Sequence, residues 1–344
     1  MLIATNTNGR QQPMPMIDVT IGDIPHPGIR PATTINEPIT LGEYANEDPI
    51  TLNPLGRNIL MTGVTDSGKT VLAHNYLDGL LAKSDNLTWV AGTYPMNPLV
   101  LPWLRPWLTG HTRRPILDRV AGTDPHEVLT LLDDFRHLAT VLSRTALYST
   151  CREVTPDMPA ISLVIDNAAH LLRDRDLRIY TRDGKEMTAA ALLRDIFELS
   201  RLASMNVFLS TWGDLGGCAP EASELARHAS VRIAGRTNTI GDSNRILDDT
   251  KDAIRATKLR DHTLLLDIAH ETYGATEGKA YNLSHPDRIS GHADAYTDRK
   301  PTMPADLADE LGDSYTNRWA PERQQCLVNA CKSLGISYPD SNVN

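Results

Sequence analysis

The sequence has few cysteines and no cysteine pattern. Its four cysteines form no Cys-x-x-Cys pair and lack the spacing of a metal site. They are Cys151, Cys218, Cys326 and Cys331. We therefore expect free thiols in a reducing cytoplasm.

Long apolar runs are missing as well. Every apolar stretch is interrupted by proline or charge well before the roughly 18 residues that a membrane-spanning helix needs. The first residues, MLIATNTNGRQQ, lack the charged region and apolar core of a signal peptide. We predict a cytoplasmic protein without a membrane span.

Positive net charge is also absent. The 344 residues include 34 Lys and Arg against 43 Asp and Glu, which gives a net charge of −9. The whole surface therefore does not attract nucleic acid, and any contact with DNA must use a local basic patch. With 41% hydrophobic residues, the chain can bury the core of one large domain or two small ones.

A phosphate-binding loop follows an apolar strand at residues 58–61. Residues 63–70 match the pattern G-x-x-x-x-G-K-[ST]. Gly63 and Gly68 allow the loop to wrap so that its N–H groups point at a phosphate near a helix N-terminus. We expect Lys69 to reach the β- and γ-phosphates and Thr70 to hold Mg²⁺. The predicted nucleotide-binding residues are Gly63, Val64, Thr65, Asp66, Ser67, Gly68, Lys69, Thr70 and Val71.

Strands alternate with helices through most of the remaining chain. Apolar strands are predicted at residues 87–92, 161–166, 207–211, 230–234 and 263–268, and a short hairpin at residues 39–52. Helices are predicted after the loop, from Asp124 onward and at residues 188–204, whereas the intervening stretch at residues 95–115 is expected to be irregular. This alternation favours an α/β fold with a mainly parallel sheet and helices on both faces.

The predicted organisation has three parts. Residues 1–34 are polar and proline-rich, and we expect an extended arm that is either a flexible leader or packs on a neighbouring subunit. Residues 35–285 form the nucleotide-binding domain. Residues 286–344 form a short tail in which residues 303–334 are compatible with two short helices.

Asp166 is the predicted second contributor to the Mg²⁺ site. It ends an apolar strand, as expected for a carboxylate that binds Mg²⁺ directly or through water. One strand and one long helix separate it from Lys69. This spacing is typical of the class in which an extra strand lies between the loop strand and the Asp strand.

The position after Asp166 is unusual. ATP hydrolases of this class generally carry glutamate there to polarise the attacking water, and this chain has Asn167. An amide can position water but cannot accept its proton. Three interpretations stay open: hydrolysis is slow, another carboxylate such as Asp214 substitutes, or the site mainly binds ATP.

Over residues 35–283 the sequence resembles the FtsK/SpoIIIE family of ring-shaped, RecA-like P-loop translocases. Four stretches carry the resemblance: PITLGEYANEDPITLNPLGRNILMTGVTDSGKT, ISLVIDNAAHLL, LSRLASMNVFLSTWGDL and ASVRIAGRTNTIGDSNRILDD. The second has Asn167 in place of Glu. The third ends like the family's Ala-Thr-Gln sensor, with Thr211 at the strand end and Trp212 in place of Gln.

The resemblance implies ATP and Mg²⁺ as cofactors and assigns roles to further residues. Arg201 is a candidate arginine finger for the site of a neighbouring subunit, and Arg245 is a second candidate; the alternative is an ordinary surface arginine. The family also implies a homo-oligomer, a hexameric ring with its substrate in the central pore.

Two basic segments are candidates to face that pore. The first contains Arg105, Arg113, Arg114 and Arg119. The second contains Arg173, Arg175, Arg178, Arg182 and Lys185. Four acidic residues within the second segment make a solvated hairpin its simplest interpretation. Its place after the Asp166 strand, where the resemblance implies a pore loop, is what keeps DNA contact as the alternative.

Our first prediction is an ATPase that moves or grips double-stranded DNA, most similar to small actinobacterial plasmid-transfer translocases of conjugation. The second is an ATPase that couples protein secretion, with a membrane complex as its partner. The third is a nucleotide-gated assembly factor with little hydrolysis, suggested by Asn167.

Overall fold

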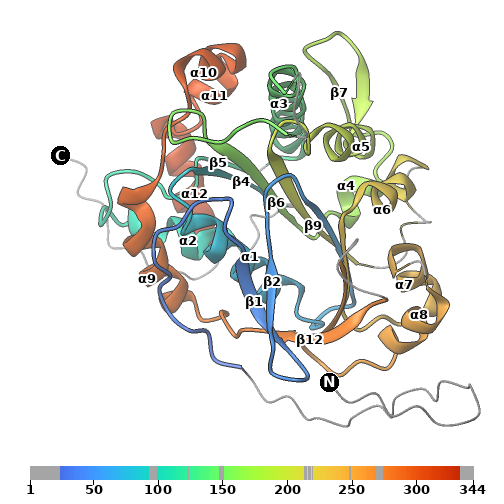
Figure 1. Cartoon of the computed structure of the whole chain (residues 1–344). Coiled ribbons are helices and arrows are strands. Elements are labelled where there is room, and N and C mark those ends of the chain that lie inside the picture. Colours follow the sequence, from blue (N-terminus) through green and yellow to red (C-terminus); the bar gives the residue numbers. More distant parts are fainter. Residues whose placement is uncertain are drawn as a thin grey trace, which may run out of the picture.

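The computed structural model describes residues 24–92, 99–122, 124–146, 151–212, 215, 218, 220–247, 249–268 and 274–333. A ten-stranded sheet forms its centre, with strand order β2-β1-β12-β11-β10-β3-β9-β6-β4-β5 (Figure 1). A separate two-stranded hairpin, β7 (Arg178–Tyr180) and β8 (Glu186–Thr188), stands outside it.

One half of the sheet is parallel. Its strands are, in order, β10 (Val231–Ala234), β3 (Asn58–Thr62), β9 (Met205–Thr211), β6 (Ala160–Asp166), β4 (Asn86–Gly92) and β5 (Arg119–Ala121). Every residue of β3, β9 and β6 is buried, as expected for strands covered on both faces. The predicted α/β fold is confirmed. So is the extra strand, because β9 lies between β3 and β6.

The other half of the sheet is antiparallel. It consists of β11 (Thr263–Ile268), β12 (Thr276–Ala280), β1 (Ile39–Tyr44) and β2 (Pro49–Leu52). The predicted lead-in hairpin is confirmed as β1 and β2, and β1 joins the sheet by pairing with β12. Alternate residues of β2 are exposed, which fits a strand at a sheet edge.

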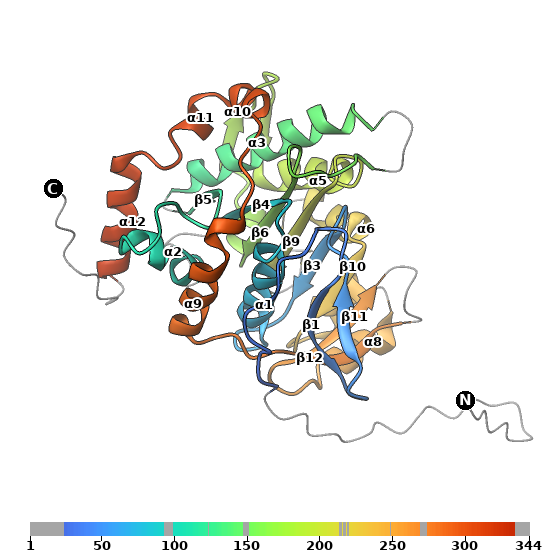
Figure 2. The same ribbon diagram turned by 60° about the vertical axis from the view of Figure 1, so that its left-hand side comes forward.

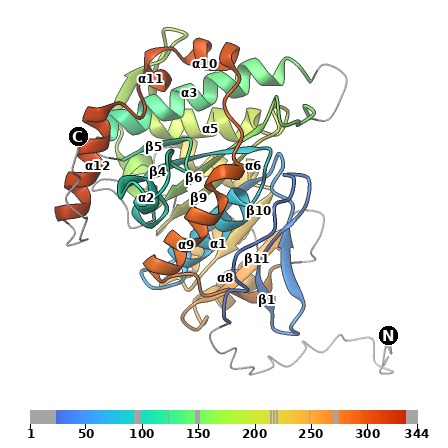
Figure 3. The same ribbon diagram turned by 90° about the vertical axis from the view of Figure 1, so that its left-hand side faces the viewer.

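Helices cover both faces of the sheet, each over its own apolar core. On one face lie α1 (Lys69–Leu81), α2 (Leu101–Leu108), α9 (Pro286–Tyr296) and α12 (Pro321–Ser333). On the other lie α3 (Pro125–Ser143), α4 (Ala169–Arg173), α5 (Ala189–Leu199) and α6 (Leu225–His228). Leu60 packs in the second core and its neighbours Ile59 and Met61 in the first, as the alternation of a strand requires. Figures 2 and 3 show both layers.

Smaller helices complete the chain. α7 (Ile240–Leu247) and α8 (Thr250–Ala256) follow β10, and the 3₁₀ helices cover Pro220–Glu224 and Thr297–Arg299. Within residues 303–333, α10 (Ala305–Leu311) and α11 (Asp313–Thr316) precede α12, so three helices lie where two were expected. None of the helices in the described part of the chain is long and apolar enough to span a membrane.

Two stretches differ from the sequence-based expectation. The stretch expected to be irregular contains α2, because Pro102 lies in the first helical turn, where its missing N–H costs little, and Trp103 is buried. The helix predicted at residues 188–204 ends at Leu199. A turn with Ser204 at a φ of 54° then returns the chain to β9.

The helix that follows the phosphate loop is anchored from both ends of the chain. Asp78 of α1 is fully buried and forms an ion pair with Arg30. His292 Nδ1 and the Tyr296 hydroxyl, both from α9, lie 2.6 and 3.0 Å from Asp78 Oδ1. Residues 24–34, the described part of the predicted arm, therefore lie against α1 of their own chain. The three-part division of the chain stays a prediction.

His26, Asp78 and His292 lie close enough together to bind a metal ion, but their hydrogen bonds favour an anchoring network. The backbone N–H of Gly28 donates to His26 Nδ1, so the proton of the neutral ring is on Nε2, the atom that faces Asp78. A metal at Nε2 would require that proton to leave. The guanidinium of Arg30 already neutralises the carboxylate.

His74 of α1 is expected to make stability pH-dependent. The ring is buried and its Nδ1 accepts a hydrogen bond from the indole N–H of Trp103 at 3.1 Å. Burial lowers the pKa of His74 from 6.5 to about 4, against a smaller opposing effect of Asp166. The unfolded chain therefore binds a proton between these values while the folded chain does not, so stability is lost as pH falls through this window.

We expect acidification from pH 7 to pH 4.5 to remove roughly 2–3 kcal/mol of unfolding free energy through His74 alone. The substitution His74→Gln, which keeps an acceptor for Trp103, should reduce the pH dependence by that amount. Urea denaturation at both pH values measures it, with the exposed His228→Gln as control. Equal pH dependence in wild type and His74→Gln would contradict the prediction.

Candidate nucleotide site

The phosphate loop connects β3 to α1 through a tight turn. Asp66 and Gly68 have positive φ values of 62° and 92°, and Gly68 directly precedes the helix. A Cβ atom on Gly63 would lie 2.3 Å from Ser67 Oγ, so this position requires glycine. The loop and the first turn of α1 thus form the concave backbone that the motif predicts, at the positive end of the helix dipole.

The side chain of Lys69 lies over this loop. Its ammonium group donates to the carbonyl oxygens of Gly63 and Val64 at 2.8 and 2.6 Å. Burial lowers the pKa of Lys69, and the negative charges of Asp166 and Asp66 oppose that shift. The ammonium is thus held at the centre of the loop, next to the carboxylate of Asp166.

The side chains of Thr70, in the first turn of α1, and Asp166, at the end of β6, are hydrogen-bonded to each other. Although they are 96 positions apart in sequence, the Thr70 hydroxyl donates to Asp166 Oδ2 at 2.9 Å. Asp166 is 2% exposed and ends β6. A hydroxyl and a carboxylate side by side at a phosphate loop are the oxygen donors that Mg²⁺ prefers.

Ser210 is a member of this site that sequence reasoning did not single out. It is fully buried on β9, and its hydroxyl donates to Asp166 Oδ1 at 2.5 Å. Ser210 Oγ also accepts the backbone N–H of Asn167 at 2.8 Å. The one available signal was a polar residue near the end of an apolar strand, which does not by itself identify its partner.

Asn167 occupies a strained backbone position. Its φ is 61°, the left-handed region that non-glycine residues seldom adopt. Such outliers at the end of a strand that carries functional groups are typical of binding and catalytic sites.

Three buried side-chain atoms around the loop make no hydrogen bond within the described part of the chain: Ser67 Oγ, Asn167 Oδ1 and Thr211 Oγ1. They belong to the loop and to the carboxyl ends of β6 and β9, which flank the same edge of the sheet. Buried polar atoms are nearly always paired, because an unpaired one loses the hydrogen bonds of water. A nucleotide phosphate with its bound cation and water fits these donors and acceptors.

The comparisons with known proteins agree with this architecture. No protein-family model matches the sequence, and no curated protein matches it either. The cytoplasmic domain of the type VII secretion ATPase EccC from Thermomonospora curvata matches with a TM-score of 0.57 and 19% identity, over 79% of this chain and 32% of that chain. ATPases 2 and 3 of EssC from Geobacillus thermodenitrificans match with a TM-score of 0.57 and 10% identity, over 86% of this chain and 52% of that chain.

The fold is that of a RecA-like P-loop ATPase domain. At these identities the likeness establishes the fold and nothing finer. The chain spans about one third of the EccC structure and about half of the EssC structure.

Trp212 lies just beyond the site, where the resemblance led us to note the absence of Gln. Its side chain is 38% exposed, and the guanidinium carbon of Arg173 lies 4.3 Å from the ring centroid. This contact joins the end of β9 to the end of α4. Asp214, the alternative carboxylate, lies outside the described residues.

A cavity of about 160 Å³ opens beside the loop. Its lining includes Gly68 and Val71 from the loop and α1, and Leu264 and Ala280 from β11 and β12. His262, Lys279, Asn282 and Ser284 complete the lining, so apolar walls are combined with a few polar groups. Such a mixed lining next to a phosphate-binding loop suits the base of a nucleotide.

The two candidate arginine fingers lie at different edges. Arg201 is exposed in the turn before β9 and touches Gly56 near the start of β3. Parallel strands about 20 Å long separate this edge from the chain's own Lys69, so Arg201 does not reach the loop of its own chain. Arg245 is exposed on α7, which follows β10 on the loop side of the sheet.

Three of the four arginines in the first basic segment have partners within the chain, and Arg113 is exposed. Arg119 is buried in β5 and pairs with Asp134 at 2.6 Å. Arg105 pairs with Asp287, and Arg114 donates to the carbonyl oxygens of two residues of the tail. These partners could not be predicted from the local composition, because most of them lie far away in the sequence.

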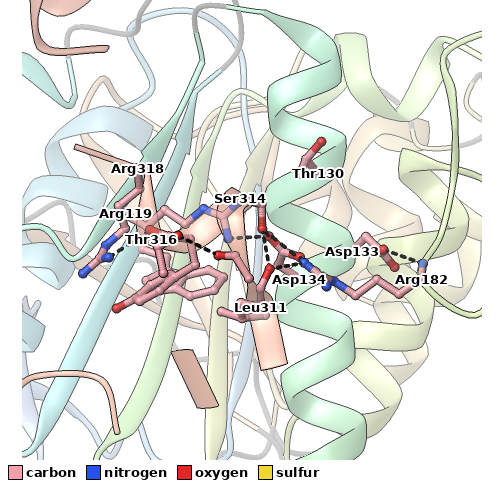
Figure 4. Close-up of polar contacts among 12 residues, drawn as sticks. Arg119, Thr130, Asp133, Asp134, Arg182, Leu311, Ser314, Thr316 and Arg318 are labelled. Atoms are coloured by element: carbon pink, nitrogen blue, oxygen red, sulfur yellow. Dashed lines mark hydrogen bonds and ion pairs between the residues drawn. The ribbon is translucent and has the colours of Figure 1, made fainter. Parts of the chain in front are cut away.

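The second basic segment contains the predicted hairpin, now seen as β7 and β8. Its outer part is exposed: Tyr180 is 77% exposed, and Arg178 pairs with Glu186 at 3.1 Å. Its turn is fixed, because Arg182 donates to Asp134 of α3 at 2.5 Å and to the carbonyl oxygen of Leu311 at 2.6 Å (Figure 4). The hairpin is thus an exposed arm with an anchored turn.

Proposed function

We propose that this protein is an FtsK-like ATPase that binds ATP with Mg²⁺ and uses it to move or grip double-stranded DNA. The observation that carries the nucleotide part is the set of buried, unpaired polar atoms around the loop, Ser67 Oγ, Asn167 Oδ1 and Thr211 Oγ1. The DNA part rests on the sequence resemblance and on the exposed hairpin with Arg178 and Tyr180.

Different residues of the site bind the phosphates, the base and Mg²⁺. The loop N–H groups and Lys69 bind the β- and γ-phosphates, and the base occupies the cavity beside Val71. Thr70 and Asp166 hold Mg²⁺, which when bound neutralises charge on the phosphates. Thr211 is available as a donor toward the γ-phosphate.

Asn167 sets the rate. Its unpaired amide oxygen can accept a hydrogen bond from the attacking water and orient it, but it cannot take the proton. We therefore propose slow basal turnover. A homo-oligomeric ring, with Arg201 of one subunit directed at the ATP of the next, would supply transition-state charge stabilisation that the isolated chain lacks.

ATP hydrolysis by the full chain with and without linear duplex DNA tests the DNA proposal. We expect the rate to rise when DNA is added and the stimulation to fall as salt is increased, since phosphate contacts dominate such binding. An ATPase rate that does not change when duplex DNA is added would contradict the DNA proposal but not the ATPase proposal.

A protein substrate is the second candidate. The net charge of −9 and the internal pairing of Arg105, Arg114 and Arg119 leave little basic surface for DNA. EccC, which shares the fold, is a type VII secretion ATPase. Stimulation by a secreted protein or its signal sequence, together with indifference to DNA, would favour this candidate.

The ATP turnover of Asn167→Glu distinguishes a slow ATPase from an assembly factor that binds ATP without hydrolysing it. A carboxylate there can act as general base, so we expect ATP turnover to rise by roughly 10²-fold. Asn167→Gln, an amide of the same length as glutamate, is the matched control and should not raise it. A lower rate in Asn167→Glu would mean that the amide is adapted to its task, as in an assembly factor that holds ATP.

A further inference from the structure

Ser210 makes more contacts to the candidate site than any role in the sheet requires. Its hydroxyl donates to Asp166 Oδ1 at 2.5 Å and accepts the N–H of Asn167 at 2.8 Å. Its carbonyl oxygen accepts the N–H of Ala168 at 2.8 Å. One residue of β9 therefore binds three consecutive residues at the end of β6.

The contact with Asp166 fixes the direction of the carboxylate. Ser210 holds Oδ1, and the Thr70 hydroxyl donates to Oδ2 at 2.9 Å. With a hydroxyl on each oxygen, the carboxylate cannot rotate without losing a charge-assisted hydrogen bond. The oxygen next to Thr70 is thereby kept where Thr70 and Asp166 can share one cation.

The contact with Asn167 stabilises its unusual backbone. A residue at φ 61° needs compensation from its surroundings, and the hydrogen bond from its N–H to Ser210 Oγ provides it. The serine hydroxyl can do both tasks at once, because its single proton goes to Asp166 and a lone pair receives Asn167.

We propose that Ser210 is a positioning residue for Mg²⁺ at the nucleotide site, acting through Asp166 and Asn167. This inference rests on the proposed function, because it assumes that Thr70 and Asp166 hold Mg²⁺ beside ATP. Substituting a residue that orients a metal ligand typically lowers metal affinity or activity by about 10–100-fold.

Ser162 offers a matched control. It is also a fully buried serine of the parallel sheet, and its hydroxyl has two hydrogen-bond partners, Asn86 and Asn206. These partners are side chains within the sheet and not residues of the loop or of the end of β6. Ser162→Ala therefore reproduces the loss of a buried hydroxyl without touching Asp166.

The test is the affinity of the full chain for a fluorescent ATP analogue, measured in EDTA and across a Mg²⁺ titration. In Ser210→Ala we expect the Mg²⁺ concentration for half-maximal effect to rise about 10–100-fold, with unchanged affinity in EDTA. Ser162→Ala should leave the Mg²⁺ midpoint unchanged. Ser210→Thr, which keeps the hydroxyl, should have the wild-type midpoint. This second variant keeps the test decisive even if circular dichroism shows that Ser210→Ala does not fold.

The outcomes separate this inference from the proposed function. Suppose that the wild-type protein binds the analogue in a Mg²⁺-dependent way. Equal Mg²⁺ midpoints for wild type and Ser210→Ala would then overturn the role of Ser210 alone. A midpoint of Ser210→Thr shifted as far as that of Ser210→Ala would do the same. A wild-type protein that does not bind the analogue overturns the proposed function and this inference with it.

Discussion

Replacing Lys69 with alanine is expected to reduce ATP turnover by about 10²–10³-fold or more, because the charge that the loop directs at the transferred phosphate is lost. The ammonium of Lys69 donates to two loop carbonyl oxygens, and the negative charge of Asp166 acts on it. Steady-state phosphate release from the full chain measures the effect.

The matched control for this substitution is Lys251→Ala. Lys251 is exposed in the first turn of α8, so its removal changes the net charge equally without touching the loop. Its turnover should equal that of wild type. Equal turnover in Lys69→Ala and wild type would show that any measured ATPase does not arise at this loop, or is a contaminant.

Asp134→Ala is expected to lower the free energy of unfolding by about 3–5 kcal/mol, because it leaves charged groups without their buried partner. Asp134 is 1% exposed on α3 and accepts from Arg119 at 2.6 Å and from Arg182 at 2.5 Å. Ser314 donates to it as well (Figure 4). The substitution therefore loosens β5, the hairpin and the tail together. Denaturant unfolding measures the loss.

Glu186→Ala provides the comparison on the same hairpin. Glu186 also pairs with an arginine, Arg178, but both side chains are nearly half exposed, so removing the pair should cost less than about 1 kcal/mol. A similar loss in the two variants would contradict the view that burial makes the Asp134 network important. An unchanged stability in Asp134→Ala would contradict it outright.

Short sequence patterns predicted those elements whose structure depends only on neighbouring residues. The loop pattern at residues 63–70 specifies its own geometry, since glycine is needed at positions 63 and 68 whatever surrounds them. The buried strands were recognisable as short apolar runs, and the alternation with helices predicted the parallel sheet. The spacing of Lys69 and Asp166 predicted that an extra strand lies between β3 and β6, and the structure identifies that strand as β9.

Features that depend on distant partners were not predictable in this way. α2 lies in a stretch that was expected to be irregular, and buried contacts of Trp103 stabilise the helix. Arg119 was counted as surface charge, yet it lies 5.0 Å from the centre of the Trp89 ring and pairs with Asp134. Neither partner is identifiable from the neighbouring sequence.

The nucleotide site illustrates the same division. The sequence by itself determined the phosphate loop, Lys69, Thr70, the strand ending at Asp166 and the amide at Asn167, because each is recognisable within a few residues. Only the tertiary structure decided that Ser210 binds both Asp166 and Asn167 and that Arg201 lies beside Gly56, at the edge of the sheet opposite its own loop. Those relations depend on the order and register of parallel strands, which bring together residues far apart in the chain.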